Sequence, residues 1–146
     1  MDPTTRALME RSLALFNGDD EQLAIFDPEV TAYESISLVQ IPPLAEGVEG
    51  LRTLVQAFRA PFPDLAITPT RLMGQGATGV CRWTARGTHL GPLLGLNIRP
   101  TAKPVELDGH FMLRRGGELV VEFWVTSDWR VLLPQIGSGP TPPPGR

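Results

Sequence analysis

Residues 105–129 have the sequence VELDGHFMLRRGGELVVEFWVTSDW, and this stretch decides the fold class. Its two parts, 105–114 and 119–129, are rich in Val, Leu, Phe and Trp, which favour strands. The pair Gly116-Gly117 lies between them, and glycines at such a place are typical of a hairpin turn. We therefore predict two antiparallel strands joined by a tight turn.

Two more strands are predicted upstream of this hairpin, at residues 65–73 and 80–90, with Gly74-Gln75-Gly76 between them. Pro69 lies within the first of these strands and has no N–H to donate, so it indicates an edge strand or a bulge. Residues 91–104 are predicted to be a long loop. The second half of the chain is thus a run of antiparallel strands.

The first half carries helix signals instead. Asp2-Pro3 supplies a cap and a proline at the first helical position, and Asn17-Gly18 ends the apolar periodicity that follows. Asp19 begins a short second helix, which Asp27-Pro28 ends. The clearest helix lies at 48–60, where apolar residues recur at i, i+3, i+4 and i+7.

A short strand is predicted at 30–34 and a loop at 41–46. Helices followed by antiparallel strands are an α+β pattern. A strongly curved sheet with helices on its concave side would enclose a conical, strand-walled pocket for a small molecule. We predict one such domain over residues 1–137 and a disordered Pro- and Gly-rich tail at 138–146.

Composition excludes several classes of protein. The chain has 146 residues and a formal net charge of -3 without a basic block, which argues against a nucleic-acid partner. Cys81 is the single cysteine, so no intramolecular disulfide can form. The N-terminus lacks the apolar core of a signal peptide, and no apolar run approaches the roughly 18 residues of a membrane span. We therefore expect a cytoplasmic protein without a membrane partner.

Five short motifs follow one another in the chain. They are FPDL at 62–65, GTHLG at 87–91, PTAKPV at 100–105, EFW at 122–124 followed by Asp128, and LLPQIG at 132–137. In this order they resemble the motifs of SnoaL-like polyketide cyclases, and the resemblance covers residues 48–137 well. The chain departs from the family at Ala102, where a glycine is usual, at 116–118, where the turn is usually DGK, and at His110, where an aliphatic residue is common.

The resemblance implies the cone-shaped fold of nuclear transport factor 2, with a pocket between sheet and helices. It also implies a small, hydrophobic, polyketide-like substrate, no metal, no cofactor, and a homodimer. Known members close a ring by intramolecular aldol addition, and an aspartate near the end of the last strand acts as the acid and base. In this chain that position is Asp128.

A carboxyl group that faces an apolar cavity has a raised pKa and can donate a proton near neutral pH, which suits Asp128 for this role. The other interpretation is an exposed carboxylate, or one paired with Arg130. Trp124 is four residues earlier on the same strand face, so we predict that it supplies an apolar wall of the pocket.

The second candidate acid or base is His110, whose direction depends on the hairpin register. A strict two-residue turn at Gly116-Gly117 places His110 opposite Phe123, on the face that Asp128 does not share. One extra residue at the turn places His110 opposite Trp124 and brings His110, Trp124 and Asp128 to one face. A histidine in the pocket would suit proton transfer near pH 7.

Other residues are candidates for substrate contact. Tyr33 is predicted to point inward, in preference to Glu34, and to donate a hydrogen bond to a carbonyl. His89 either fixes a loop or contacts substrate. Arg82 matches an arginine common in the family, but its strand face is also typical of a solvated surface. The apolar wall is predicted to include, besides Trp124, the following residues: Phe111, Met112, Leu94 and Leu96.

The loop that contains Leu94 and Leu96 is unusually apolar. It is either a lid over the ligand or a segment packed into the core or a dimer interface. Cys81 is interpreted as a core residue. The sequence has no metal-ligand spacing, no glycine-rich nucleotide motif and no G-x-S-x-G, so neither metal nor cofactor is predicted.

We therefore predict a cyclase of secondary metabolism, as in antibiotic biosynthesis. Ring closure could use aldol-type acid and base chemistry or a pericyclic [4+2] reaction of a polyene, which needs only shape and one hydrogen bond. The alternatives are an isomerase or epoxide hydrolase on the same fold, or a non-catalytic binding or dimerisation module.

Overall fold

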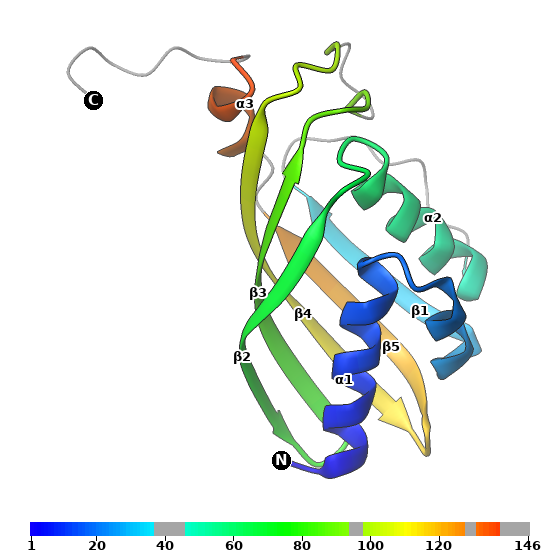
Figure 1. Ribbon diagram of the computed structural model, residues 1–146. Coiled ribbons are helices and arrows are strands. Elements are labelled where there is room, and N and C mark those ends of the chain that lie inside the picture. Colours follow the sequence, from blue (N-terminus) through cyan, green and yellow to red (C-terminus); the bar gives the residue numbers. More distant parts are fainter. Residues whose placement is uncertain (37–45, 94–97, 128–130, 138–146) are drawn as a thin grey trace.

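The computed structural model describes residues 1–36, 46–93, 98–127 and 131–137. The two long helices lie on the concave side of one curved, unclosed sheet of five strands (Figure 1). The elements in chain order are α1 (Pro3–Phe16), the 3-10 helix η1 (Asp20–Ile25), β1 (Phe26–Ile36), α2 (Val48–Arg59), β2 (Ala66–Gln75), β3 (Thr78–Thr88), β4 (Pro104–Gly116), β5 (Leu119–Ser127) and α3 (Leu132–Gln135). The α+β prediction is thus confirmed.

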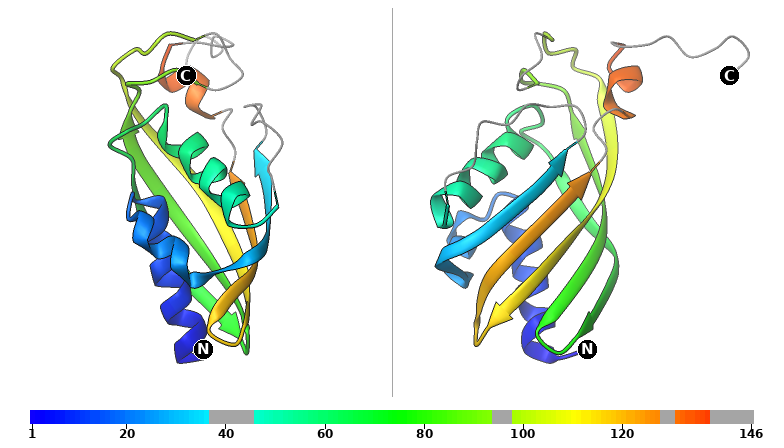
Figure 2. Two further views of the ribbon diagram at one scale, coloured as in Figure 1. Left: turned by 90° about the vertical axis from the view of Figure 1, so that its right-hand side faces the viewer. Right: turned by 180° about the vertical axis from the view of Figure 1, so that it is seen from behind.

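The strand order in the sheet is β1-β5-β4-β3-β2. Strands β2 to β5 form an antiparallel meander, whereas β1 pairs with β5 in parallel. The sheet twists and coils around α1 and α2, as the two further views in Figure 2 show. This arrangement places the core between the concave sheet face and the two long helices.

The ends of α1 follow the predicted signals. The Thr5 N–H donates to the Asp2 carboxylate at 3.0 Å, which caps the helix. At the other end, the Asn17 side chain donates to the carbonyl of Ile67 at 2.9 Å and accepts from its N–H at 2.6 Å. Because one amide satisfies both backbone groups of Ile67, the end of α1 is fixed to β2.

The short second helix differs from the prediction. It is a 3-10 helix that ends at Ile25, and Phe26 already pairs with Val120 of β5. Pro28 therefore lies inside β1 and does not end a helix. The physical reason is that β1 is an edge strand, where a residue without an N–H can face away from the ladder. The strand is also longer than the predicted 30–34.

Other predicted elements agree with the structure. Helix α2 has the predicted apolar face, and β2 is an edge strand whose register shifts between Pro69 and Arg71, so the predicted edge position and bulge are both confirmed. The predicted tail at 138–146 lies outside the described residues, as do all but the last residue of the predicted loop at 41–46.

The β4–β5 hairpin has neither of the two predicted registers. Its turn residues are Gly117 and Glu118, and Gly117 has a φ of 64°, as the first central position of a type II′ turn requires. Gly116 pairs with Leu119, and Arg115 pairs with Val120, but Arg114 pairs with Glu122. The turn thus lies one residue later than expected, and a bulge adds a second shift. His110 consequently pairs with Thr126.

Candidate functional site

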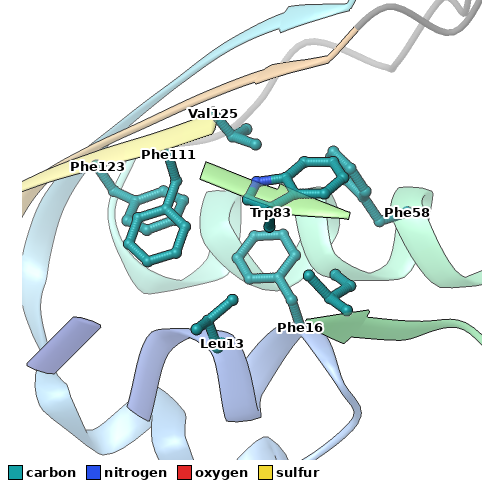
Figure 3. A pocket seen from close by; sticks show the side chains of 8 residues that line it. Leu13, Phe16, Phe58, Trp83, Phe111, Phe123 and Val125 are labelled. Carbon is teal, nitrogen blue, oxygen red and sulfur yellow. The ribbon is translucent and has the colours of Figure 1, made fainter. Parts of the chain in front are cut away.

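A pocket lies between the concave sheet face and the helices, and its walls are apolar. It is lined by Leu13, Phe16, Phe58, Ile67, Trp83, Phe111, Phe123 and Val125 (Figure 3). The unfilled space around these side chains, open solvent included, is about 250 Å³, but little of it is enclosed. It is so narrow that it leaves room for roughly one water molecule. A larger ligand must therefore push side chains or helices apart to enter.

Aromatic rings form much of the wall. The rings of Phe111 and Phe123 stack at a centroid distance of 5.3 Å, and Phe16 stacks on Phe123 at 5.7 Å. Phe58 of α2 meets Phe16 edge to face at 5.5 Å. Such pairs contribute about 0.5–1.5 kcal/mol each beyond area burial. The wall thus joins α1 and α2 to β4 and β5.

Trp83 forms the wall on β3 and is 2% exposed. Its indole meets the ring of Phe58 edge to face at 6.3 Å. On its other side it lies over Gly109 of β4, where an added Cβ would collide with the six-membered ring. Gly109 therefore provides the space that the indole occupies.

The structure divides the predicted pocket residues between the two faces of the sheet. Phe111 lies in the pocket wall. Met112, Trp124, His110 and Arg82 lie on the outer, convex face, because side chains alternate along a strand and the inner positions of β3 and β4 are those of buried residues. None of these four residues lines the described pocket, and His110 and Arg82 are exposed. The expectation that the hairpin could bring His110 into the pocket is therefore wrong.

Tyr33 also lies on the outer face. It is 46% exposed, and its ring stacks on the indole of Trp124 with a centroid distance of 5.3 Å. The expected inward direction is contradicted, because the pairing of Tyr33 with Trp124 gives both side chains the same face. A hydrogen bond from Tyr33 to a carbonyl inside this pocket is thus not available.

Three predicted site residues lie outside the described residues, namely Asp128, Leu94 and Leu96. Asp128 follows directly after Ser127, the last residue of β5, in the sequence. Its role as acid and base stays a prediction.

His89 is fully buried but does not line the pocket. Its Nδ1 accepts a hydrogen bond from the N–H of Thr101 at 3.2 Å and lies 3.0 Å from the Thr101 hydroxyl oxygen. The backbone of His89 also bonds to Lys103 and Ala102. Burial lowers the pKa of His89, because the charged imidazolium is disfavoured away from water. This geometry supports the loop-fixing role for His89.

The first three sequence motifs meet at this end of the molecule. The Asp64 carboxylate accepts hydrogen bonds from the Thr88 hydroxyl at 2.7 Å and from the Thr88 N–H at 2.8 Å. These bonds lower the pKa of Asp64. Ala102, where the family usually has glycine, has a φ of 57°, in the left-handed region. The motifs thus hold the loop that precedes β4.

Cys81 is buried, and burial raises the pKa of its thiol to about 11, so it is a core residue rather than a nucleophile. Within the described part of the chain, no cluster of three or more His, Cys, Asp or Glu side chains could hold a metal ion. Among the described helices, none is both long and apolar enough to span a membrane.

Sequence reasoning missed most of the pocket wall, including Phe16, Phe58, Trp83 and Phe123. A signal was present: Cys81, Trp83 and Ala85 alternate with Arg82, Thr84 and Arg86, so the apolar residues indicate the inner face of β3. No local pattern indicates that Phe16 and Phe58 are in contact, because they lie on separate helices.

Comparison with known proteins agrees with this geometry. The model of the SnoaL-like polyketide cyclase family matches residues 13–136. IdmH from Streptomyces antibioticus, a proposed polyketide cyclase, is 28% identical, with a TM-score of 0.77 over 91% of this chain and 98% of that chain. AclR from Streptomyces galilaeus, a proposed hydroxylase, is 24% identical, with a TM-score of 0.77 over 96% of this chain and 85% of that chain.

The fold is also that of a Catenulispora acidiphila protein described as ketosteroid isomerase-like. That protein is 16% identical, with a TM-score of 0.68 over 92% of this chain and 97% of that chain. No curated protein sequence matches the chain significantly.

Proposed function

Because the chain belongs to the SnoaL-like polyketide cyclase family, we propose that it is a cyclase that closes a carbocycle in a polyketide-like intermediate without a cofactor. The observation that carries this proposal is the apolar, aromatic-walled pocket between the sheet and the helices. Such a pocket would hold a flexible chain in a folded conformer, and a fixed geometry of the reacting carbons can supply much of the rate enhancement.

The chemistry has two versions. In the aldol version Asp128 removes a proton from an acidic carbon of the substrate and returns a proton to the new alkoxide. In the pericyclic version two new carbon–carbon bonds form at once between a diene and an alkene of the same chain, and no proton moves. The lack of ionisable side chains in the described pocket wall favours the pericyclic version.

The biological setting that we propose is a secondary-metabolite pathway in the cytoplasm, as in antibiotic biosynthesis. Support comes from the resemblance to a proposed polyketide cyclase of Streptomyces antibioticus. The alternative proposal is a non-catalytic binding module on the same fold. The small free space of the pocket favours this alternative, because its own side chains already occupy most of it.

The product decides between a cyclase and a binding module. Purified protein is incubated with linear polyene and poly-β-ketone thioesters, and the products are followed by liquid chromatography and mass spectrometry. We expect an isomer of the substrate, or that isomer less one water, to accumulate catalytically. Val125→Phe fills the pocket and should abolish the product, whereas Val131→Phe alters an exposed residue outside the pocket and should not. Binding of these compounds without turnover would contradict the cyclase.

We further propose that two copies pair through the outer face of the sheet. An apolar row crosses all five strands there, in register, and consists of Tyr33, Trp124, Met112, Val80 and Met73. Tyr33 and Met73 are 46% and 54% exposed. Polar residues flank the row on both sides, as His110 and Arg114 do on β4. An apolar centre with a polar rim is typical of protein interfaces.

The size of this face supports the same proposal. Five strands about 4.8 Å apart, with ten residues of about 3.3 Å each, give a face of roughly 600 Å² per copy. Two such faces together reach the lower limit of the interface area of stable complexes, about 1,200 Å². A second copy is a suitable partner because it would cover an identical apolar row with its own.

A further inference from the structure

Trp83 is the largest side chain in the wall of the pocket, and the residues beside it on the inner face of the sheet are small. Cys81 and Ala85 precede and follow it on that face of β3, and both are buried. Its partner on β4 is Gly109, and its partner on β2, Pro69, is exposed. Because these neighbours have short side chains or none, the space over this part of the sheet belongs to the indole.

The indole is held from two sides. A Cβ added at Gly109 would collide with two carbons of its six-membered ring, so the ring lies directly on the backbone of β4. Phe58 of α2 packs edge to face on the indole, with a centroid distance of 6.3 Å. Figure 3 shows the indole between Phe58 and the pair Phe111 and Phe123. The ring therefore occupies a slot between β4 and α2 that adjoins the pocket.

The other aromatic side chains of the wall pack on one another. Phe123 stacks on both Phe16 and Phe111, and Phe58 meets Phe16. If one of these rings is shortened, its aromatic neighbours can move into the gap, and the ability of a site to collapse decides how much space a truncation leaves. The small residues of the sheet beside Trp83 cannot fill its slot in this way. Space vacated by the indole should therefore stay open.

We infer that Trp83 determines the size of the ligand segment that the pocket accepts. This inference rests on the proposed function, because it requires that the pocket binds a ligand. With the indole in its slot, the pocket leaves room for roughly one water molecule. The indole cannot yield toward the sheet, because the backbone of Gly109 is already in contact with it. A wide ligand must therefore displace the indole toward the helices.

A class of substrate follows from this wall. Fused rings are wide and rigid, so they would have to force the indole out of its slot, and forcing extra volume into a packed core is unfavourable. An alkyl or polyene chain is slender and needs a smaller movement of the wall. The wild-type pocket thus selects an open chain or a single ring over fused rings. A cyclase with this pocket would close one ring of an open chain.

The experiment uses two rigid probes that differ by one fused ring, benzene and naphthalene. Their affinities for the wild-type chain and for Trp83→Leu are measured by titration calorimetry. The ratio of naphthalene to benzene affinity should rise by roughly tenfold or more in the variant, because each apolar carbon buried in the vacated slot can contribute about fourfold. Trp83→Phe removes less volume, so its ratio should be intermediate, and it keeps the test valid if Trp83→Leu does not fold.

Thermal unfolding gives a second readout. A ligand that binds the folded chain raises its melting temperature. Naphthalene should raise the melting temperature of Trp83→Leu more than benzene does at equal saturation of the aqueous phase. In the wild type, naphthalene should have the smaller effect of the two.

Two further variants serve as controls. Phe62→Leu also removes a buried ring, but Phe62 packs against Gly87 outside the pocket wall, so the affinity ratio should stay as in the wild type. Phe111→Leu removes a ring from the stacked part of the wall. It should raise the ratio less than Trp83→Leu does, because Phe123 can move into the gap.

The outcomes separate the inference from the proposed function. If the probes bind the wild type and the ratio is the same in both Trp83 variants, the inference is overturned and the pocket remains a ligand site. An equal rise in Phe111→Leu and Trp83→Leu would also overturn it, since the whole wall would then set the size. If the probes bind only the Trp83 variants, the inference stands and the proposed function is contradicted. Binding to none of these chains would contradict both.

Discussion

The ring of Tyr33 lies flat on the indole of Trp124, with centroids 5.3 Å apart and planes 8° apart. This pair joins β1 to β5 on the outer face of the sheet, opposite the pocket. Two residues that the sequence suggested for substrate binding therefore belong to the surface where we place a second copy. The inner pocket, which we propose binds the ligand, and the outer row, which we propose binds a second copy, thus lie on opposite faces of the sheet.

Association through the outer row can be tested with one charge. Met112→Glu places a carboxylate at the centre of the row, next to Trp124. Burying that charge in an interface is unfavourable, so the dimer dissociation constant should rise by roughly thirty-fold or more. Sedimentation velocity over a concentration series measures this change.

The control for this variant is Ala60→Glu, which adds the same charge at an exposed position at the end of α2. It should leave the dissociation constant unchanged. A wild-type chain that sediments as a monomer at every concentration would contradict the proposed dimer.

Gly109 is expected to be the most sensitive glycine of β4. Gly109→Ala would force a Cβ into the Trp83 ring and close to the carbonyl oxygen of Thr126. Overpacking of this kind costs about 1–3 kcal/mol, so the free energy of unfolding should fall by that amount. Urea unfolding followed by circular dichroism measures it. His110→Ala, one residue further on the exposed face, should change stability by less than about 0.5 kcal/mol.

Much of the fold could be predicted because local signals decide it. The cap at Asp2, the apolar face of α2 and the bulge near Pro69 each follow from the chemistry of a few neighbouring residues. The end of η1 could not be predicted from local signals. Phe26 belongs to β1 because it pairs with Val120, which is about a hundred residues away in the sequence.

The site was less predictable than the fold, and the β4–β5 hairpin shows why. Gly116-Gly117 permits several registers, and the bulge between Arg114 and Arg115 adds a shift that no turn residue indicates. Each shift of one residue exchanges the inner and outer faces, so a small error in register misplaces every candidate on the strand. The placement of His110 depended on that register.

The buried His89 should make stability depend on pH. Its pKa is lowered in the folded state, so below the ordinary value of about 6.5 the unfolded chain binds a proton that the folded chain does not. The contribution of neutral His89 to the free energy of unfolding is fully present above pH 6.5 or so, and it is lost as the pH falls toward the pKa of His89 in the folded state. Protonation would also displace the hydrogen bond from the Thr101 N–H to Nδ1.

The measurement is the free energy of unfolding between pH 8 and pH 5. For one proton its slope is at most about 1.4 kcal/mol per pH unit. His89→Gln should flatten this slope, whereas His110→Gln, at the other histidine, should not. An equal slope in wild type and His89→Gln would contradict the assignment to His89.

Asp128→Asn distinguishes the two versions of ring closure, because the amide keeps the size of the side chain but cannot exchange the proton. If Asp128 is the acid and base, kcat should fall by about 10²–10⁴-fold, the usual contribution of such a group, with KM little changed. If closure is pericyclic, kcat should stay within a few-fold of wild type. Asp108→Asn is the matched control, since Asp108 is exposed on the outer face and bonds to Thr84. A solvent deuterium isotope effect on kcat in the wild type should accompany the first outcome and be absent from the second, because only the aldol route moves a proton in the step that forms the ring.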